Sequence, residues 1–239
     1  MKALLANEFA PVTLTLGFVE CPFTEFSEAF TRWQKGLDAQ FGTQTEVCRF
    51  RAPLSEAILK LEPLVTPSDR YLLIETRSGW SAIFSNGLRV NDVNSPVSYL
   101  PTVLKCRGLE VFCIPDRSDK NFKDALQIYG AVVFTLYGSE KTDFLNRIRH
   151  IGVTHDVSGW EFMAQGEIQP FEKTENYQRR KVADRFTDEM LESYCEALGI
   201  KVFDANFYGG ECLVSHITKR AVPSDLTMSI SEARSHLFI

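Results

Sequence analysis

The chain has 239 residues, of which 26 are lysine or arginine and 31 are aspartate or glutamate, so its formal net charge at pH 7 is −5. This charge excludes a generic basic nucleic-acid binder, because such proteins neutralise phosphates with a clustered positive surface. Hydrophobic residues make up 44% of the chain and charged residues 24%, which argues against a disordered, collagen-like or coiled-coil protein.

The N-terminus and the cysteines predict a cytoplasmic protein. Asn7 and Glu8 interrupt the apolar start of the chain before a signal-peptide core could form. The longest later apolar run, residues 131–137, has the length of a strand and falls far short of the roughly 20 residues of a membrane span. The six cysteines lie far apart without a C-x-x-C pair, which is typical of buried, reduced thiols and disfavours structural zinc.

Hydrophobic periodicity and turn residues predict the elements of the first half of the chain. Short runs of apolar and β-branched residues predict strands over residues 12–20, 45–51, 71–76, 80–84 and 108–114. Helices are predicted over residues 23–41, 54–61 and 96–104, the last interrupted at Pro101. The third and fourth strands form a hairpin in which Gly79 is expected to take the positive φ of a tight turn.

The second half is predicted to continue with strands and one well-marked helix. The expected strands cover residues 126–136, 147–154, 160–166, 202–203 and 212–217. The second and third of these form an antiparallel pair, and a turn at residues 208–210 joins the last two. The helix begins after Thr187, a suitable N-cap, and ends at Gly199.

Together these elements predict one α+β domain over residues 1–239, with a mixed, mostly antiparallel sheet and a few packed helices. No fixed-period repeat or low-complexity tract occurs in the sequence, which excludes a repeat architecture. The polar stretch near residues 116–122 is a candidate subdomain seam that would divide the domain into two lobes.

The sequence contains no clear catalytic or metal-binding pattern. His150 and His155 lack the H-E-x-x-H spacing that lets two imidazoles share zinc, and no G-x-S-x-G nucleophile motif occurs. Residues 138–142 lack the glycine-rich start of a phosphate loop. We therefore predict no catalytic residue, no cofactor and no metal. One alternative stays open, a hydrolase or transferase in which His150 or His155 meets a distant carboxylate in the fold.

Acidic residues are concentrated between residues 156 and 175, where Lys173 is the one basic residue. Alternation along a strand directs Glu161, Met163 and Gln165 to one face. The predicted partner-binding residues are Asp156, Glu161, Met163, Glu167, Glu172 and Glu175. On such a surface the carboxylates steer a basic protein toward the chain, and the methionine anchors it.

Two alternatives to this partner-binding surface stay open. The acidic residues can serve solubility alone, and the chain can act as an adaptor through an exposed strand edge. The basic run at residues 178–185 is bordered by acidic residues, so it is predicted to be a solvated, ion-paired face rather than a binding site.

Three stretches together resemble a known family: ETRSGW at residues 75–80, KCRG at residues 105–108, and DRFT at residues 184–187, which leads through ALGI to FD at residues 203–204. The chain resembles the immunity proteins of bacterial contact-dependent growth inhibition systems, including those paired with EndoU-type RNA-cleaving toxins. The resemblance implies a non-enzymatic protein that binds a cognate toxin, a nuclease domain, and contacts neither nucleic acid nor membrane. These proteins share no catalytic motif, so no site residue follows from the resemblance.

Charge and resemblance lead to the same hypothesis. A nuclease must bind anionic RNA, so its substrate groove is expected to be basic, and an acidic protein can occupy such a groove. We therefore expect a cytoplasmic protein that binds a basic, RNA-cleaving toxin and occludes its active site or substrate surface.

Overall fold

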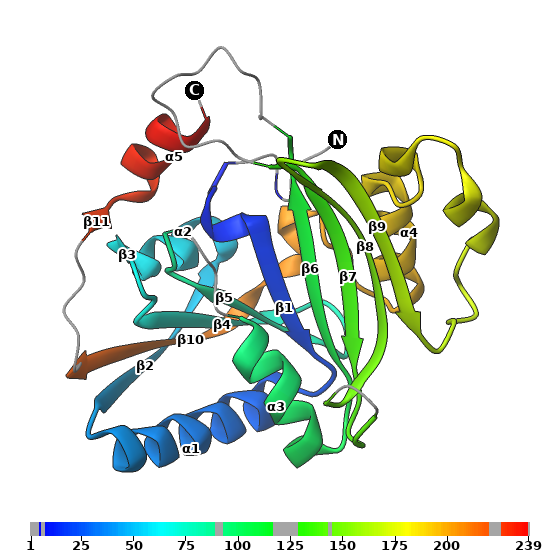
Figure 1. Cartoon of the computed structure of the whole chain (residues 1–239). Helices are drawn as coiled ribbons and strands as arrows, with labels where there is room; N and C mark the ends of the chain where they lie inside the picture. The colour runs from blue at the N-terminus through cyan, green and yellow to red at the C-terminus, as the bar shows by residue number, and fades with distance from the viewer. Residues whose placement is uncertain are drawn as a thin grey trace.

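The computed structural model describes residues 5, 8–88, 93–116, 129–142, 145–219 and 226–238. Their framework is a nine-stranded sheet in the order β2-β10-β4-β5-β1-β6-β7-β8-β9 (Figure 1). Its strands are β1 (Thr15–Val19), β2 (Gln44–Pro53), β4 (Arg70–Thr76), β5 (Ser81–Ser85), β6 (Gly108–Ile114), β7 (Ala131–Tyr137), β8 (Arg147–Asp156), β9 (Gly159–Gly166) and β10 (Tyr208–Lys219).

All neighbouring strands of this sheet run antiparallel. The predicted α+β class is confirmed, but the expectation of a mixed sheet is wrong for the described strands. The reason lies in the order of the strands: β6 to β9 are neighbours in sequence as well as in the sheet, and such strands can pair antiparallel without the long crossover that a parallel pair needs. A separate two-stranded sheet pairs β3 (Leu64–Val65) with β11 (Thr227–Met228).

Different helices cover the two faces of the sheet (Figure 1). They are α1 (Phe23–Phe41), α2 (Leu54–Ala57), α3 (Asn94–Leu104), α4 (Asp188–Ala197) and α5 (Ile230–Phe238). Side chains of α1 and α3 form one apolar cluster with the first face, and those of α2, α4 and α5 form a larger cluster with the second. Along β4, Leu73 belongs to the first cluster, whereas Leu72 and Ile74 belong to the second.

Helix α1 follows the prediction from end to end. Phe26 and Phe30 are fully buried, and the Phe30 ring packs edge-on against Tyr71 of β4, with 5.4 Å between ring centroids. The helix ends at Gly42, whose φ of 67° lies in the left-handed region that glycine adopts without strain. The 3.6-residue period of the large side chains therefore identified both the helix and its buried face.

Helix α3 lies unusually close to the sheet and runs through Pro101 without the predicted interruption. Proline has no N–H, so Pro101 cannot donate to the carbonyl oxygen of Val97 four residues earlier. That same oxygen lies nearest to Gly108 of β6, where an added Cβ would overlap it. The missing side chain of Gly108 therefore permits the helix backbone to approach the strand.

Two predicted turns are built differently from the expectation. The β4–β5 hairpin is confirmed, but Gly79 does not adopt a positive φ. Side chains hold this turn instead, because the Thr76 hydroxyl donates to the backbone oxygen of Trp80, and the Trp80 N–H donates to the Ser78 hydroxyl over 3.3 Å.

The predicted turn at residues 208–210 lies inside β10, and residues 202–203 do not form a strand. Gly209 and Gly210 have φ values of 147° and 120°, and the pairing with β4 shifts its register between Tyr208 and Cys212. The two glycines therefore lie in a β-bulge. Glycine is preferred both in bulges and in turns, which explains why a turn was predicted here.

The predicted strand over residues 126–136 begins later, at Ala131 of β7, and residues 126–128 lie outside the described residues. The candidate seam near residues 116–122 also lies outside them, apart from Asp116, so the division into two lobes stays a prediction. Within the described ranges, no helix has both the length and the apolar character that a membrane crossing needs.

Candidate partner-binding surface

Two of the six predicted surface residues, Glu161 and Met163, lie on β9, the outermost strand at one end of the sheet. Glu161 and Met163 point away from the core and are exposed, with 48% of Met163 accessible. Trp160 and Phe162, the alternate residues, pack against the larger apolar cluster on the opposite face. The period-two alternation predicted for this strand is therefore confirmed at these positions.

Further exposed residues border Glu161 and Met163. Asp156 lies at the turn between β8 and β9, and the register places it on the same face as Glu161. The Ser158 hydroxyl and backbone N–H donate to the Asp156 carboxylate over 2.6 and 2.7 Å and lower its pKa. Glu167 directly follows β9 and is exposed. We call Asp156, Glu161, Met163 and Glu167 the acidic β9 surface.

Two exposed apolar side chains flank the acidic β9 surface. Val157 in the β8–β9 turn is 89% exposed, and Ile168, next to Glu167, is 61% exposed. Exposed apolar groups of this size beside charges are typical of association surfaces, because the apolar atoms contribute burial and the charges contribute steering.

Glu175 is exposed but belongs to a different side of the molecule. It lies in the short turn η4 (Thr174–Gln178), whose Tyr177 ring packs on Phe162 with 5.2 Å between centroids. Phe162 is on the core side of β9, opposite Glu161. The structure therefore separates Glu175 from the acidic β9 surface.

Glu172 is not a surface residue, so its predicted place in a partner-binding surface is wrong. Its side chain is fully buried and forms an ion pair with Arg149 of β8, whose side chain is 4% exposed. Two parallel hydrogen bonds of 2.9 and 2.7 Å join the Arg149 Nε and Nη2 atoms to the two carboxylate oxygens. Counting acidic residues along the chain missed this pair because its members are 23 positions apart.

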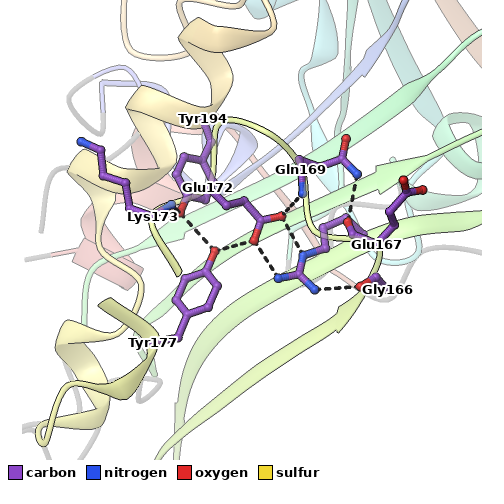
Figure 2. A network of polar contacts seen from close by, with 8 residues as sticks. Gly166, Glu167, Gln169, Glu172, Lys173, Tyr177 and Tyr194 are labelled. Carbon is purple, nitrogen blue, oxygen red and sulfur yellow. Dashed lines mark hydrogen bonds and ion pairs between the residues drawn. The ribbon is translucent and has the colours of Figure 1, made fainter. Parts of the chain in front are cut away.

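The rest of the Glu172 network satisfies the buried carboxylate (Figure 2). The Tyr177 hydroxyl donates to one oxygen over 2.8 Å, and the Gln169 backbone N–H donates to the other over 2.7 Å. Burial, together with the hydrogen bonds that Tyr177 makes with Tyr194 and Glu172, raises the pKa of Tyr177 well above its usual value. These contacts attach the segment after β9 to the sheet. The Arg149–Glu172 pair therefore has a structural role.

The predicted ion pairing of the basic run near residue 180 is confirmed for Lys181. Lys181 lies 3.3 Å from the Asp184 carboxylate, and the Arg179 guanidinium donates to the backbone oxygen of Asp184. The Arg185 guanidinium lies over the Phe162 ring at 5.8 Å. Arg185 therefore lies on the core side of β9, opposite the face that carries Glu161 and Met163.

His150, one of the two candidate histidines, is held neutral. Its Nδ1 atom lies 2.9 Å from the Thr135 hydroxyl on β7. Burial, with smaller contributions from the positive charges of Arg147 and Arg149, lowers the pKa of His150 to about 4. A base with this pKa is a poor match for proton transfer near neutral pH.

This depressed pKa predicts a pH dependence of stability. Between pH 6.5 and 4 the unfolded chain binds a proton on His150 that the folded chain does not bind, so the free energy of unfolding should fall as the pH falls through this window. For a fully buried group, this shift of the His150 pKa would correspond to about 3 kcal/mol in the free energy of unfolding. Because the His150 side chain is partly exposed, the expected loss is roughly 1–2 kcal/mol. Urea unfolding at pH 7 and pH 4 should show a smaller loss for His150→Gln than for the native chain. If both proteins lose the same free energy of unfolding between pH 7 and pH 4, the depressed pKa does not belong to His150.

His155, the other candidate, forms the histidine–carboxylate contact that the enzyme alternative needs. Its Nδ1 atom lies 3.1 Å from Asp116 Oδ1, and its ring stacks on Trp160 with 4.8 Å between centroids. Sequence reasoning missed Asp116, which is 39 residues away. A cavity of about 610 Å³ lies elsewhere, lined by residues that include Arg51, Ser55 and Tyr208. An enzyme that uses His155 stays a prediction.

Neither a metal centre nor a known relative identifies the function. Among the residues that the structure describes, no group of three or more His, Cys, Asp or Glu side chains could hold a metal ion. Comparison with protein-family models, with curated proteins and with solved structures gave no match. The exposed surfaces of this chain therefore carry the information about its function.

Proposed function

We propose that the chain is a non-enzymatic binding protein that neutralises a basic protein, in the manner of an immunity protein and its toxin. One observation carries this proposal: Met163 is half-exposed on the outermost strand between exposed carboxylates, while the Arg185 guanidinium packs on Phe162 of the opposite face. A charged rim around an apolar anchor suits reversible association with a protein of opposite charge.

A toxin that cleaves RNA fits the chemistry of this surface. Its substrate groove must attract phosphates and is therefore expected to carry lysine and arginine side chains. The carboxylates of Asp156, Glu161 and Glu167 can occupy the positions of phosphate charges, and Met163 can be buried at the centre of the contact. Neutralisation would then be steric and electrostatic, and would need no catalytic residue of this chain.

Charge reversal tests the proposal. The double variant Glu161→Lys/Glu167→Lys is expected to bind the toxic domain encoded beside this chain roughly tenfold more slowly, because exposed rim charges act mainly on the rate of encounter. The association rate should be measured by stopped-flow fluorescence across a range of salt concentrations. Native binding should slow as salt rises, and the variant should lose most of this dependence.

The matched control is Glu46→Lys/Glu56→Lys, which makes the same change of charge. Glu46 lies on β2, at the opposite end of the sheet, and Glu56 lies in α2; both are exposed. If the control slows association as much as the β9 variant does, the effect comes from net charge and the acidic β9 surface is not the contact. If the two native proteins do not bind, the proposed function is wrong.

A further inference from the structure

Cys21 and Cys106 lie near one another, just after the last residue of β1 and just before the first residue of β6. The antiparallel register pairs Val19 with Gly108, and the Glu20 N–H donates to the Arg107 oxygen over 2.9 Å, which extends the register by one pair. Cys21 and Cys106 are the residues next to this contact, one beyond Glu20 and one before Arg107. At Cys21 the chain leaves the strand, because its N–H donates to the Val19 oxygen over 2.9 Å. Cys106 directly follows Lys105, whose left-handed φ of 57° ends helix α3.

Side-chain alternation agrees with this placement. Glu20 and Arg107 form an ion pair with 2.6 Å between Oε1 and Nη2, and the Arg107 guanidinium lies over the Trp80 ring, on the second face of the sheet. Cys21 and Cys106 belong to the cluster on the first face, below α1 and α3. The two thiols therefore point to the same side, as a cross-strand disulfide requires.

The two thiols differ in access and in acidity. Cys21 is 6% exposed, whereas Cys106 is partly exposed. The interaction with Cys21 lowers the pKa of Cys106 against the opposing effect of burial, and the interaction with Cys106, together with burial, raises the pKa of Cys21. Cys106 is therefore the thiol that an external disulfide can reach, whereas Cys21 can react only with a disulfide formed on its neighbour Cys106.

We propose that Cys21 and Cys106 form a redox site that exchanges with a low-molecular-weight disulfide, such as oxidised glutathione, and closes reversibly into an intramolecular disulfide. In the first step the Cys106 thiolate attacks one sulfur of the small disulfide, and the other sulfur leaves as a thiolate. In the second step the Cys21 thiol loses its proton to solvent, and the resulting thiolate attacks the Cys106 sulfur and expels the second small thiolate, which takes up a proton. Two protein thiols are oxidised, and one small disulfide is reduced to two thiols.

Closure would connect two helices that cover the same face of the sheet. Helix α1 begins at Phe23, two residues after Cys21, and helix α3 ends at Leu104, two residues before Cys106. The bond would join chain positions 85 residues apart, a long loop whose closure removes much conformational freedom from the unfolded chain. The oxidised protein is therefore expected to melt at least about 5 °C higher than the reduced protein.

The test uses the folded, full-length chain and oxidised glutathione, followed by alkylation of the remaining thiols, intact mass measurement and peptide mapping. The expected product is a Cys21–Cys106 cross-linked peptide that dithiothreitol removes. Exposed Cys48 should become glutathionylated and so report that the reagent is active, while Cys113 and Cys195, buried on the other face, should stay unmodified.

Two single variants test the order of the steps. Cys21→Ser should retain one glutathione on Cys106, because the resolving thiol is missing. Cys106→Ser should leave Cys21 unmodified, because the buried thiol cannot reach the reagent. Circular dichroism and thermal melting of the reduced proteins check that each variant is folded. The proposal is overturned if Cys48 is modified while Cys21 and Cys106 of the native chain both remain alkylatable, or if Cys106 keeps glutathione despite the presence of Cys21.

Discussion

Glu172→Ala is expected to lower the free energy of unfolding by about 3–5 kcal/mol, the usual cost of removing one partner of a buried ion pair. The substitution leaves the Arg149 guanidinium, only 4% exposed, without its carboxylate. It also removes the acceptor for the Tyr177 hydroxyl and the Gln169 N–H, and each unsatisfied buried donor adds to the loss. Urea unfolding monitored by tryptophan fluorescence measures the effect.

A double variant separates the cost of an unpaired charge from the cost of losing the pair. Arg149→Met/Glu172→Leu removes both charges while keeping apolar volume, so it should recover a large part of the stability that Glu172→Ala loses. Glu167→Ala, an exposed acidic residue of the same segment, should change stability by less than about 0.5 kcal/mol. If Glu172→Ala is as mild as Glu167→Ala, the ion pair is not buried in solution.

The difference between Glu161 and Glu172 shows what the sequence could predict about the candidate site. Glu161 belongs to a strand with local alternation, so its exposure follows from the identity of Trp160 and Phe162 beside it. Glu172 follows an irregular segment, and its burial depends on Arg149, which is brought near by the pairing of β8 with β9. Alternation along a strand predicts which face a side chain occupies. It does not predict an ion-pair partner that is distant in the sequence.

The same distinction applies to the fold. Helix α1 and the β8–β9 hairpin were predicted because their signals lie within a short window of sequence. The sheet order could not be predicted, since β10 lies between β2 and β4, far from its neighbours in sequence. The proximity of Cys21 and Cys106 likewise depends on the pairing of β1 with β6, which are separated by α1 and several further strands.

Gly108→Ala is expected to lower the free energy of unfolding by about 3 kcal/mol, at the upper end of the usual cost of overpacking. The added methyl group would overlap the carbonyl oxygen of Val97 and crowd the Pro101 ring. Backbone atoms of a packed helix cannot rotate out of the way as a side chain can, so α3 would have to move away from β6. Thermal and urea unfolding of the variant measure this cost.

Two other glycines provide matched controls for the same chemical change. Gly36 lies exposed in α1 with open space around it, so Gly36→Ala should raise the free energy of unfolding by about 0.5–1 kcal/mol through helix propensity. Gly17 of β1 also faces α3, but an added Cβ there would meet side-chain methyl groups of Val97 and Ile83 at 2.5 and 2.7 Å, whereas at Gly108 it would meet a backbone oxygen at a shorter distance. Gly17→Ala should therefore cost less than Gly108→Ala. The opposite order would mean that α3 does not hold its Val97 carbonyl against β6, and that the close approach assigned to Gly108 is wrong.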